Sequence, residues 1–287
     1  MQTLSEADFI LNADGSIYHL NLLPEDIANT IITVGDPDRV AEISQYFDKI
    51  ELRKGKREFI THTGYVGKKR ITVLSTGIGT DNIDIVLNEL DALVNINFDS
   101  RTVKPQLTSL AIIRIGTSGA IQEDIPMGSI LASTYGLGLD TLMHYYASSA
   151  DDKTEQLRKA LITQLELPLQ IQPYLSAADP GLLHHFGKDM MQGITATAPG
   201  FYAPQGRQLR VKNVFPDLIS RLNRFQYAQH RISNLEMETA GIYALANQLG
   251  HRALSINAIL ASRVKNAFSP HPKKIVQGAI KTVLERI

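Results

Sequence analysis

The chain has 287 residues, no cysteine, and 29 basic side chains against 29 acidic ones, which excludes disulfides and thiolate metal sites and argues against nucleic acid as a partner. No segment has the length of a membrane span, and residues 1–20 lack the basic and apolar regions of a signal peptide, so we expect a cytoplasmic protein that does not bind membranes. The length suffices for the core of one large α/β domain or of two smaller ones.

Strand-like and helix-like segments alternate along the chain. Short β-branched or apolar runs predict strands at residues 31–34, 57–66, 70–76, 111–115, 128–135, 170–177, 194–198 and 251–261. Apolar residues three or four apart predict helices at residues 37–47, 83–94, 154–165, 180–187, 215–227, 239–249 and 272–287. Residues 1–30 are irregular, and the polar residues 95–108 predict an inserted surface loop. No linker or repeat interrupts this alternation, which predicts one α/β domain around a mixed sheet.

The predicted strand 111–115 and the small residues after it form the first candidate for a ligand site. Arg114 lies in this apolar run, and residues 116–119 (GTSG) predict a tight loop after the strand. A guanidinium in an apolar strand needs an anionic partner, and Thr117 with backbone N–H groups at the glycines would complete an oxyanion cradle. The alternative is a strand in which Arg114 forms an ion pair beside the core.

Two other turns are candidates for binding an anion or a substrate. Arg39 lies in the first turn of the predicted helix that Asp36 caps, where free N–H groups favour anions; an ordinary solvated arginine is the alternative. Gly77 and Gly79 superficially suggest a dinucleotide fingerprint. Because Asn82 replaces the third glycine of that motif, a turn that lets a substrate approach the backbone is the better interpretation.

The loop at residues 199–207 combines an amide and a guanidinium near an aromatic ring. Gln205 and Arg207 lie two positions apart and close to Phe201 in the sequence. An amide both donates and accepts, and an arginine adds a charged donor, so the pair would read the edge of a planar heterocycle. Two solvated loop side chains are the alternative.

A pair of carboxylates, Glu236 and Glu238, flanks Met237. At this spacing both carboxylates face the same side of an extended segment. They would serve as acid and base or would bind a vicinal diol, with Met237 packing on the face of a sugar. The alternative is a helix N-terminus enriched in glutamate.

Hydrolytic and metal-binding signatures are missing from the sequence. The eight histidines include no HExxH pattern, so no metal site is expected. Ser118 lies in Thr-Ser-Gly rather than in a Gly-x-Ser-x-Gly elbow, which argues against a serine nucleophile.

Five motifs occur together in one order: GDPDRV, STGIG, RIGTSGAIQ, FYxxQGR and NLEMET. In this order and spacing the chain resembles the nucleoside phosphorylase family, and within it the bacterial uridine phosphorylases, from about Tyr18 to the C-terminus. The resemblance implies a single three-layer α/β/α domain over residues 1–287 with a central twisted mixed β-sheet. It also implies homodimers that in many members close into hexamers. The implied reaction is the reversible phosphorolysis of uridine to uracil and ribose 1-phosphate, with inorganic phosphate as co-substrate and no organic cofactor.

The resemblance also implies the roles of individual residues. The residues implied to stabilise charge during the reaction are Arg114, Gln205 and Arg207. The residues implied to bind phosphate are Gly35, Arg39, Arg114 and Thr117, with Arg57 of a neighbouring subunit. Those implied to bind the ribose are Glu236, Met237 and Glu238, with His19 of a neighbouring subunit. Those implied to bind the base are Phe201, Gln205, Arg207 and Arg263. Some relatives hold a monovalent cation at the dimer interface, near positions that correspond here to Glu58, Ile71 and Ser75.

Three alternative functions stay open at this point. A purine nucleoside phosphorylase of the same family would carry an aspartate just after the strand that here ends in Ala261, Ser262 and Arg263, and this chain has none there. A nucleosidase that uses water would not need the phosphate-binding arginines. A non-catalytic nucleoside-binding protein would not need the complete set of phosphate and ribose residues.

Overall fold

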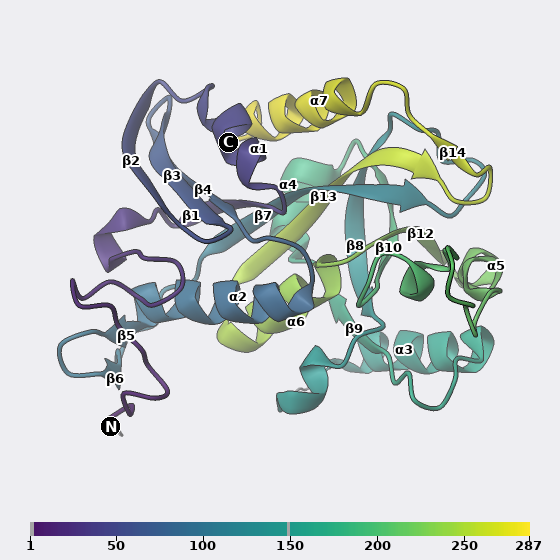
Figure 1. Cartoon of the computed structure of the whole chain (residues 1–287), viewed down its shortest axis with the longest axis horizontal. Coiled ribbons are helices and arrows are strands. Elements are labelled where there is room, and N and C mark those ends of the chain that lie inside the picture. The colour runs from purple at the N-terminus through teal and green to yellow at the C-terminus, as the bar shows by residue number, and fades with distance from the viewer. Residues whose placement is uncertain (1–2, 148–149) are drawn as a thin grey trace.

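A mixed β-sheet of 12 strands runs through the molecule, and the computed structural model describes residues 3–147 and 150–287 (Figure 1). Across the sheet the main strands are β11 (Gln226–Tyr227), β12 (His230–Glu236), β10 (Met191–Thr197), β8 (Ile130–Gly138), β13 (Arg252–Ser262), β7 (Ala111–Ala120), β1 (Thr30–Val34), β4 (Lys69–Ser75), β3 (Phe59–Val66) and β2 (Lys49–Lys56). The short strands β9 (Tyr174–Ala177) and β14 (Ala267–Phe268) pair with β8 and β13, while β5 (Ile96–Asn97) and β6 (Thr102–Val103) form a separate hairpin.

Helices cover both faces of this sheet. The α-helices are α1 (Pro37–Ser44), α2 (Thr80–Asn95), α3 (Asp152–Leu165), α4 (Pro180–Gly187), α5 (Leu218–Arg224), α6 (Thr239–Leu249) and α7 (Pro272–Leu284). The short 3-10 helices are η1 (Pro24–Asp26), η2 (Leu142–Tyr145) and η3 (Ala203–Gln205). Figure 1 shows α2 and α6 together on one side of the sheet, with α1 and α7 on the other, and α6 packs directly on β8 and β13. The predicted three-layer α/β/α fold is confirmed.

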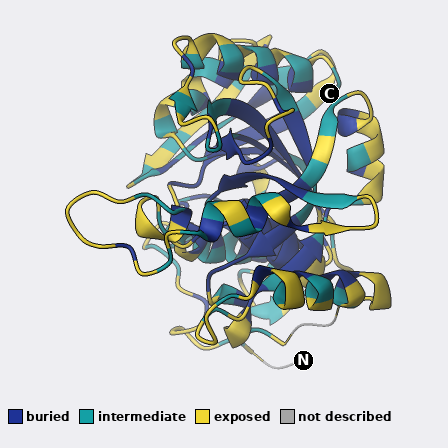
Figure 2. Ribbon diagram, turned by 90° about the vertical axis from the view of Figure 1, so that its right-hand side faces the viewer, coloured by how far each residue is buried: buried dark blue, intermediate teal, exposed yellow. Residues whose placement is uncertain are grey.

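Burial follows the chemistry of each element. The outer faces of the helices are exposed and the central strands are buried (Figure 2). Nearly every residue of β7 is buried, as expected for a strand between two layers of helices. The edge strand β2, by contrast, alternates between exposed and half-buried residues and carries several lysines, which protect an edge from pairing with other chains.

Strand β12 closes part of the sheet into a ring. It pairs with β10 along its length and also with β7, where Asn234 lies opposite Ala120 and Leu235 lies opposite Gly119. Strands β7, β13, β8, β10 and β12 therefore form a closed circuit of hydrogen-bonded neighbours, which we call the strand ring. The sequence analysis did not predict this ring, because it depends on a pairing between residues far apart in the chain.

The boundaries of several predicted elements are wrong. Residues 116–119 were predicted as a loop, but they continue β7 because they pair with β13. The helix predicted at 215–227 is shorter: Phe225 adopts an extended backbone and buries its ring, so α5 ends at Arg224 and β11 follows. The strand β2 was not predicted, since its lysine-rich sequence lacks an apolar run.

Candidate active site

One edge of β7 lacks a strand partner where the small residues lie. On this edge β7 pairs with β1 up to Arg114 and with β12 only from Gly119. No strand of the described residues pairs with the edge between these two positions, which includes Gly116 and Thr117. Backbone groups on this edge are therefore free to bind a ligand.

A cleft of about 800 Å³ lies at this open edge. It brings together every site residue that the sequence analysis predicted except His19 and Arg57. The predicted residues that line it are Gly35, Arg39, Arg114, Thr117, Phe201, Gln205, Arg207, Glu236, Met237, Glu238 and Arg263. They come from the middle of β7, from the ends of β1, β12 and β13, from the first turn of α1 and from the loop around η3.

Arg114 is buried and held by two carboxylates. Its Nη2 lies 2.5 Å from Glu238 Oε2 and 2.9 Å from Glu236 Oε2. Its Nη1 donates to Asn257 Oδ1 at 3.0 Å and to Ser255 Oγ at 3.3 Å. Burial lowers the pKa of Arg114, but the two carboxylates outweigh burial and hold that pKa above its ordinary value. The ion pair that the sequence left open as an alternative is thus present, and the same arginine lines the cleft.

Gly116 makes room for the side chain of Arg114. Residues two positions apart on a strand share a face, so the guanidinium of Arg114 lies over Gly116. A Cβ atom on Gly116 would lie 1.7 Å from Arg114 Nη1. Only glycine fits at this position while Arg114 keeps its conformation.

The two carboxylates beside Arg114 differ in how many hydrogen bonds they accept from the protein. Glu236 accepts hydrogen bonds from Thr197 Oγ1 at 2.7 Å and from the N–H groups of Glu238 and Thr239, each at 3.0 Å from Oε2, so it fixes the start of α6. Besides Arg114, Glu238 accepts a bond only from Gly79 N, at 2.9 Å from Oε1, among the described residues. Burial raises the pKa of Glu238, with Arg114 opposing the shift. Glu238 therefore has the greater capacity to accept from a ligand.

The amide and guanidinium of the loop at η3 are held together. Arg207 Nη1 donates to Gln205 Oε1 at 2.6 Å and to Phe201 O at 2.7 Å, and its guanidinium carbon lies 3.8 Å from the centre of the Phe201 ring. Burial, helped by the neighbouring charge of Arg263, lowers the pKa of Arg207 to about 10. The ring of Phe201, predicted to pack near a sugar and base, here supports Arg207.

Two further arginines face the cleft with unused donors. Arg263 Nη1 is buried and has no hydrogen-bond partner among the described residues. Burial lowers the pKa of Arg263 and also that of Arg39, where Asp36 opposes the shift. A partly desolvated guanidinium gains strongly from an anionic or carbonyl partner, so both residues favour such a ligand.

His19 and Arg57 lie outside the cleft of their own chain. His19 Nδ1 lies 2.6 Å from Glu89 Oε1, and the Glu89 carboxylate also accepts from the backbone N–H groups of His19 and Leu20. Arg57 is exposed at the turn between β2 and β3, with a φ of 56°. Their contribution to a neighbouring subunit stays a prediction.

A profile of the Phosphorylase superfamily matches residues 29–285. The chain belongs to this superfamily. It is 31% identical over 277 residues to the uridine phosphorylase of Thermococcus kodakarensis, covering 95% of this chain and 88% of that protein. It is 27% identical to the Escherichia coli uridine phosphorylase, covering 94% of this chain and 96% of that protein.

A solved structure has the same fold as this phosphorylase. It is a nucleoside phosphorylase of Trypanosoma brucei, described as showing uridine phosphorylase activity. The TM-score is 0.88 at 28% identity, over 97% of this chain and 99% of that one. A purine nucleoside phosphorylase of Shewanella oneidensis is also similar, at 28% identity over 83% of this chain and 84% of that protein. The part of the phosphorylase that the structure describes contains no helix that is long and apolar enough to cross a membrane.

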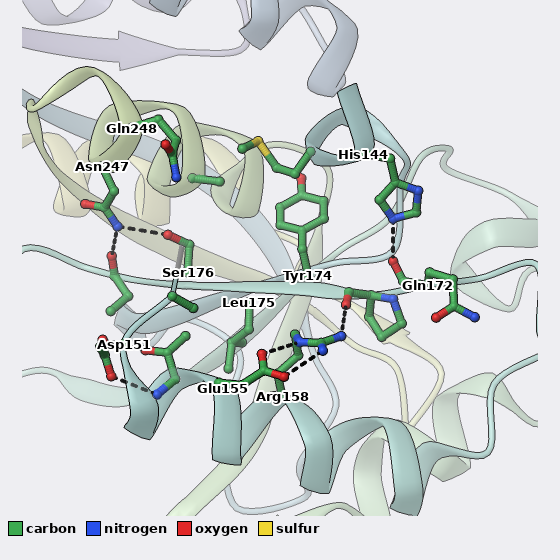
Figure 3. Close-up of a pocket in the computed structure, with 16 residues that line it drawn as sticks. His144, Asp151, Glu155, Arg158, Gln172, Tyr174, Leu175, Ser176, Asn247 and Gln248 are labelled. Carbon is green, nitrogen blue, oxygen red and sulfur yellow. Dashed lines mark hydrogen bonds and ion pairs between the residues drawn. The ribbon is translucent and has the colours of Figure 1, made fainter. Parts of the chain in front are cut away.

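A second pocket, of about 570 Å³, lies between α3, β9 and the end of α6 (Figure 3). Several of its polar side chains bind one another or nearby backbone groups. Glu155 and Arg158 form an ion pair, with Oε2 and Nε 2.7 Å apart, and Asp151 accepts from the N–H of Thr154. His144 Nε2 lies 2.9 Å from the carbonyl oxygen of Gln172. None of the predicted site residues lines this pocket.

The cation site that the resemblance suggests is not a carboxylate cluster. Among the described residues, no group of three or more histidine, cysteine or acidic side chains could hold a metal ion. Ser75 Oγ donates to the carbonyl oxygen of Glu58 at 2.5 Å, and Ile71 is buried. A monovalent cation at Glu58, Ile71 and Ser75 therefore stays a prediction.

Sequence reasoning missed two residues that contact Arg114 in the phosphorylase site. Ser255 and Asn257 contact Arg114, but the pattern predicts only an apolar strand at these positions. Their signal was present, because two polar residues interrupt the run LSINAILA. A buried polar side chain in such a run needs a partner, and here that partner is the guanidinium.

Proposed function

We propose that this phosphorylase catalyses the reversible phosphorolysis of uridine to uracil and ribose 1-phosphate. The observation that carries the proposal is the content of the cleft. One cavity holds the arginines and open strand edge for a phosphate, Met237 and Glu238 for a ribose, and the paired Gln205 and Arg207 for a base. The similarity to curated uridine phosphorylases over most of the chain supports the same reaction.

In the proposed complex, phosphate binds at the open edge of β7. Arg39 and Arg114 supply charged donors, and Thr117 with the backbone at this edge supplies neutral ones. Arg57 of a neighbouring subunit would add a third guanidinium. Phosphate is a heavily hydrated and poor nucleophile, so its orientation below the sugar accounts for a large part of the catalysis.

During the reaction, opposite charges develop on the ribose and on the base. Glu238 accepts from a ribose hydroxyl and Met237 packs on the sugar. As the glycosidic bond stretches, positive charge develops on the sugar beside phosphate, and negative charge develops on the departing base beside Arg207. Because Arg207 holds Gln205 Oε1, the amide NH₂ points away from it and donates to a uracil carbonyl, while Oε1 accepts from the N3–H. This reaction requires no covalent enzyme intermediate and no organic cofactor.

Phosphate-dependent release of uracil from uridine tests the proposal directly. We expect uracil to appear only when phosphate is present and its rate to saturate with phosphate. Release without phosphate would indicate a nucleosidase, and binding without release would indicate a nucleoside-binding protein. Faster cleavage of inosine or adenosine than of uridine would move the enzyme to the purine branch of the superfamily.

Gln205→Ala is expected to weaken discrimination between bases. Cytidine lacks the N3–H, so its N3 sets acceptor against acceptor at Gln205 Oε1, and its amino group sets donor against donor where uracil has a carbonyl. Loss of this amide should lower kcat/KM for uridine by about tenfold to a hundredfold and change the value for cytidine little. Steady-state kinetics with both nucleosides measure the effect, with the exposed Gln277→Ala as control. An unchanged uridine-to-cytidine ratio would contradict the assignment.

We further propose a cytoplasmic homodimer in which each subunit completes the site of the other. His19→Ala and Arg207→Ala each disable one component, so hybrid dimers of these two variants have one site with both defects and one with neither. Co-expression with two affinity tags should therefore restore up to half of the wild-type activity per hybrid dimer.

The matched control for this hybrid pairs Gln205→Ala with Arg207→Ala. These two residues lie in one loop of one chain, so every site of that hybrid keeps a defect and activity stays low. A His19→Ala and Arg207→Ala hybrid as inactive as its parents would exclude the shared site.

A further inference from the structure

A chain of buried polar side chains crosses the strand ring and ends at the cleft on both sides. Each of the five ring strands contributes one member, and Arg114 lies at one end. In order, the members are Asn257 from β13, Ser133 from β8, Thr195 from β10, Asn234 from β12 and Ser118 from β7. The first four are fully buried, at 0% exposure, and Ser118 lines the cleft.

Arg114 sets the direction of the first hydrogen bonds in this chain. A guanidinium only donates, so Asn257 must turn Oδ1 toward Arg114 Nη1, 3.0 Å away. Its NH₂ group then donates to Ser133 Oγ at 2.9 Å. Thr195 uses its own proton on Asn234 Oδ1, so the Ser133 hydroxyl is the donor to Thr195 Oγ1, 2.5 Å away.

The same direction continues to the other wall of the cleft. Thr195 Oγ1 donates to Asn234 Oδ1 at 2.8 Å, and Ser233 Oγ donates to the same oxygen at 2.7 Å. The NH₂ of Asn234 therefore faces Ser118 and donates to its Oγ at 2.9 Å. The direction of each hydrogen bond in this series is thereby fixed, which gives the interior of the ring a fixed geometry.

Arg114 needs such support because its other nitrogen binds groups that a ligand also uses. Nη2 is held by Glu236 and Glu238, and Glu238 is the residue with capacity to accept from a ribose. Nη1 is held from the opposite side by the neutral oxygens of Asn257 and Ser255. A neutral acceptor fixes the guanidinium without adding a third negative charge, which would repel a phosphate dianion.

We propose that Asn257 is a positioning residue for phosphate: with Ser133 behind it, it holds Arg114 in the orientation that binds the anion. This inference rests on the proposed function. Asn257 is fully buried and does not line the cleft, so it acts through Arg114 rather than by touching a substrate.

Asn257→Leu tests the proposal, because leucine has a similar size and removes the acceptor. We expect the KM for phosphate to rise about tenfold, while the KM for uridine and the uridine-to-cytidine ratio stay close to wild type. The control is Thr63→Val, which removes a comparable buried hydrogen bond, from Thr63 Oγ1 to the carbonyl oxygen of Asp26 at 2.7 Å. That variant should lose stability and keep its phosphate KM.

Two companion variants keep the test decisive. Ser133→Ala removes the partner that orients the Asn257 amide, so it should raise the phosphate KM by a smaller factor, and it decides the question if Asn257→Leu does not fold. In an Arg114→Lys background, Asn257→Leu should change the phosphate KM little further, since the bond it removes is already lost.

The results that would overturn the proposal are specific. An Asn257→Leu enzyme with wild-type phosphate KM, or one in which the phosphate and uridine KM values rise equally, would show that Asn257 serves only the fold. A full additional effect in the Arg114→Lys background would also exclude action through Arg114. Failure of the proposed function looks different, because the wild-type enzyme itself would then show no saturation with phosphate.

Discussion

Arg114→Ala is expected to reduce both phosphate-dependent turnover and stability. A charge-assisted hydrogen bond contributes roughly 1.5–3 kcal/mol, so kcat/KM for phosphate should fall about tenfold to a few hundredfold. The variant also leaves Glu236 and Glu238 buried without their cation, and removal of one partner from a buried ion pair costs about 3–5 kcal/mol. Phosphate saturation kinetics and thermal unfolding measure the two effects.

The loss of stability in Arg114→Ala should depend on pH. Burial already raises the pKa of Glu238 above its ordinary value of 4.5, and the loss of Arg114 raises it further. A carboxyl with a raised pKa binds its proton more tightly in the folded state than in the unfolded state. Its contribution to stability is therefore greatest at low pH and is lost as pH rises above 4.5 through the folded-state pKa. The variant should accordingly lie closer to wild type in Tm at pH 5 than at pH 8.

A surface arginine provides the control for this experiment. Arg231 pairs with Asp124, with Nη2 and Oδ2 2.7 Å apart, but Arg231 is partly exposed and Asp124 is largely exposed. Arg231→Ala should change Tm by a small amount, because exposed ion pairs contribute about 0–1 kcal/mol. If Arg114→Ala loses no more stability than Arg231→Ala, or loses more at pH 5 than at pH 8, the two glutamates are not the charges that Arg114 neutralises.

Local sequence patterns predicted most elements of the fold. The helices at 180–187 and 239–249 were predicted with the boundaries that α4 and α6 have, since their apolar spacing and flanking residues are local signals. The strand ring could not be predicted in this way. It depends on Asn234 lying opposite Ala120, a contact that only the packed sheet creates.

In the candidate site, too, the sequence predicted the residues but not the contacts that depend on the packed sheet. Motifs in the sequence identified Arg114, Glu238 and Arg207 as a set, and the cleft brings them together. The sequence did not show that the edge of β7 beside Gly116 lacks a partner, because this depends on where β1 ends and where β12 begins. Nor did it show that Asn257 is the residue that holds Arg114, although a polar side chain in an apolar strand signals that some partner exists.

Gly116→Ala is expected to displace Arg114 without altering its charge. The new Cβ would lie 1.7 Å from Arg114 Nη1, a separation that no pair of non-bonded atoms tolerates, so the guanidinium must leave its position between Glu238 and Asn257. The phosphate KM should rise at least tenfold, and overpacking of the strand should cost about 1–3 kcal/mol of stability. Phosphate saturation and thermal unfolding again provide the measurements.

Two other glycines separate displacement of Arg114 from general effects of the added methyl group. Gly278 lies on α7 with open space around its Cβ position, so Gly278→Ala should leave activity and stability near wild type or slightly improve stability. A Cβ on Gly187 would lie 2.7 Å from Ala132 Cβ, outside the cleft, so Gly187→Ala should lose stability but keep its phosphate KM.

In an Arg114→Ala background the clash between Gly116→Ala and the guanidinium no longer exists, and Gly116→Ala should then raise the phosphate KM little further. Equal effects of Gly116→Ala in both backgrounds would mean that it acts on the strand and not through the guanidinium.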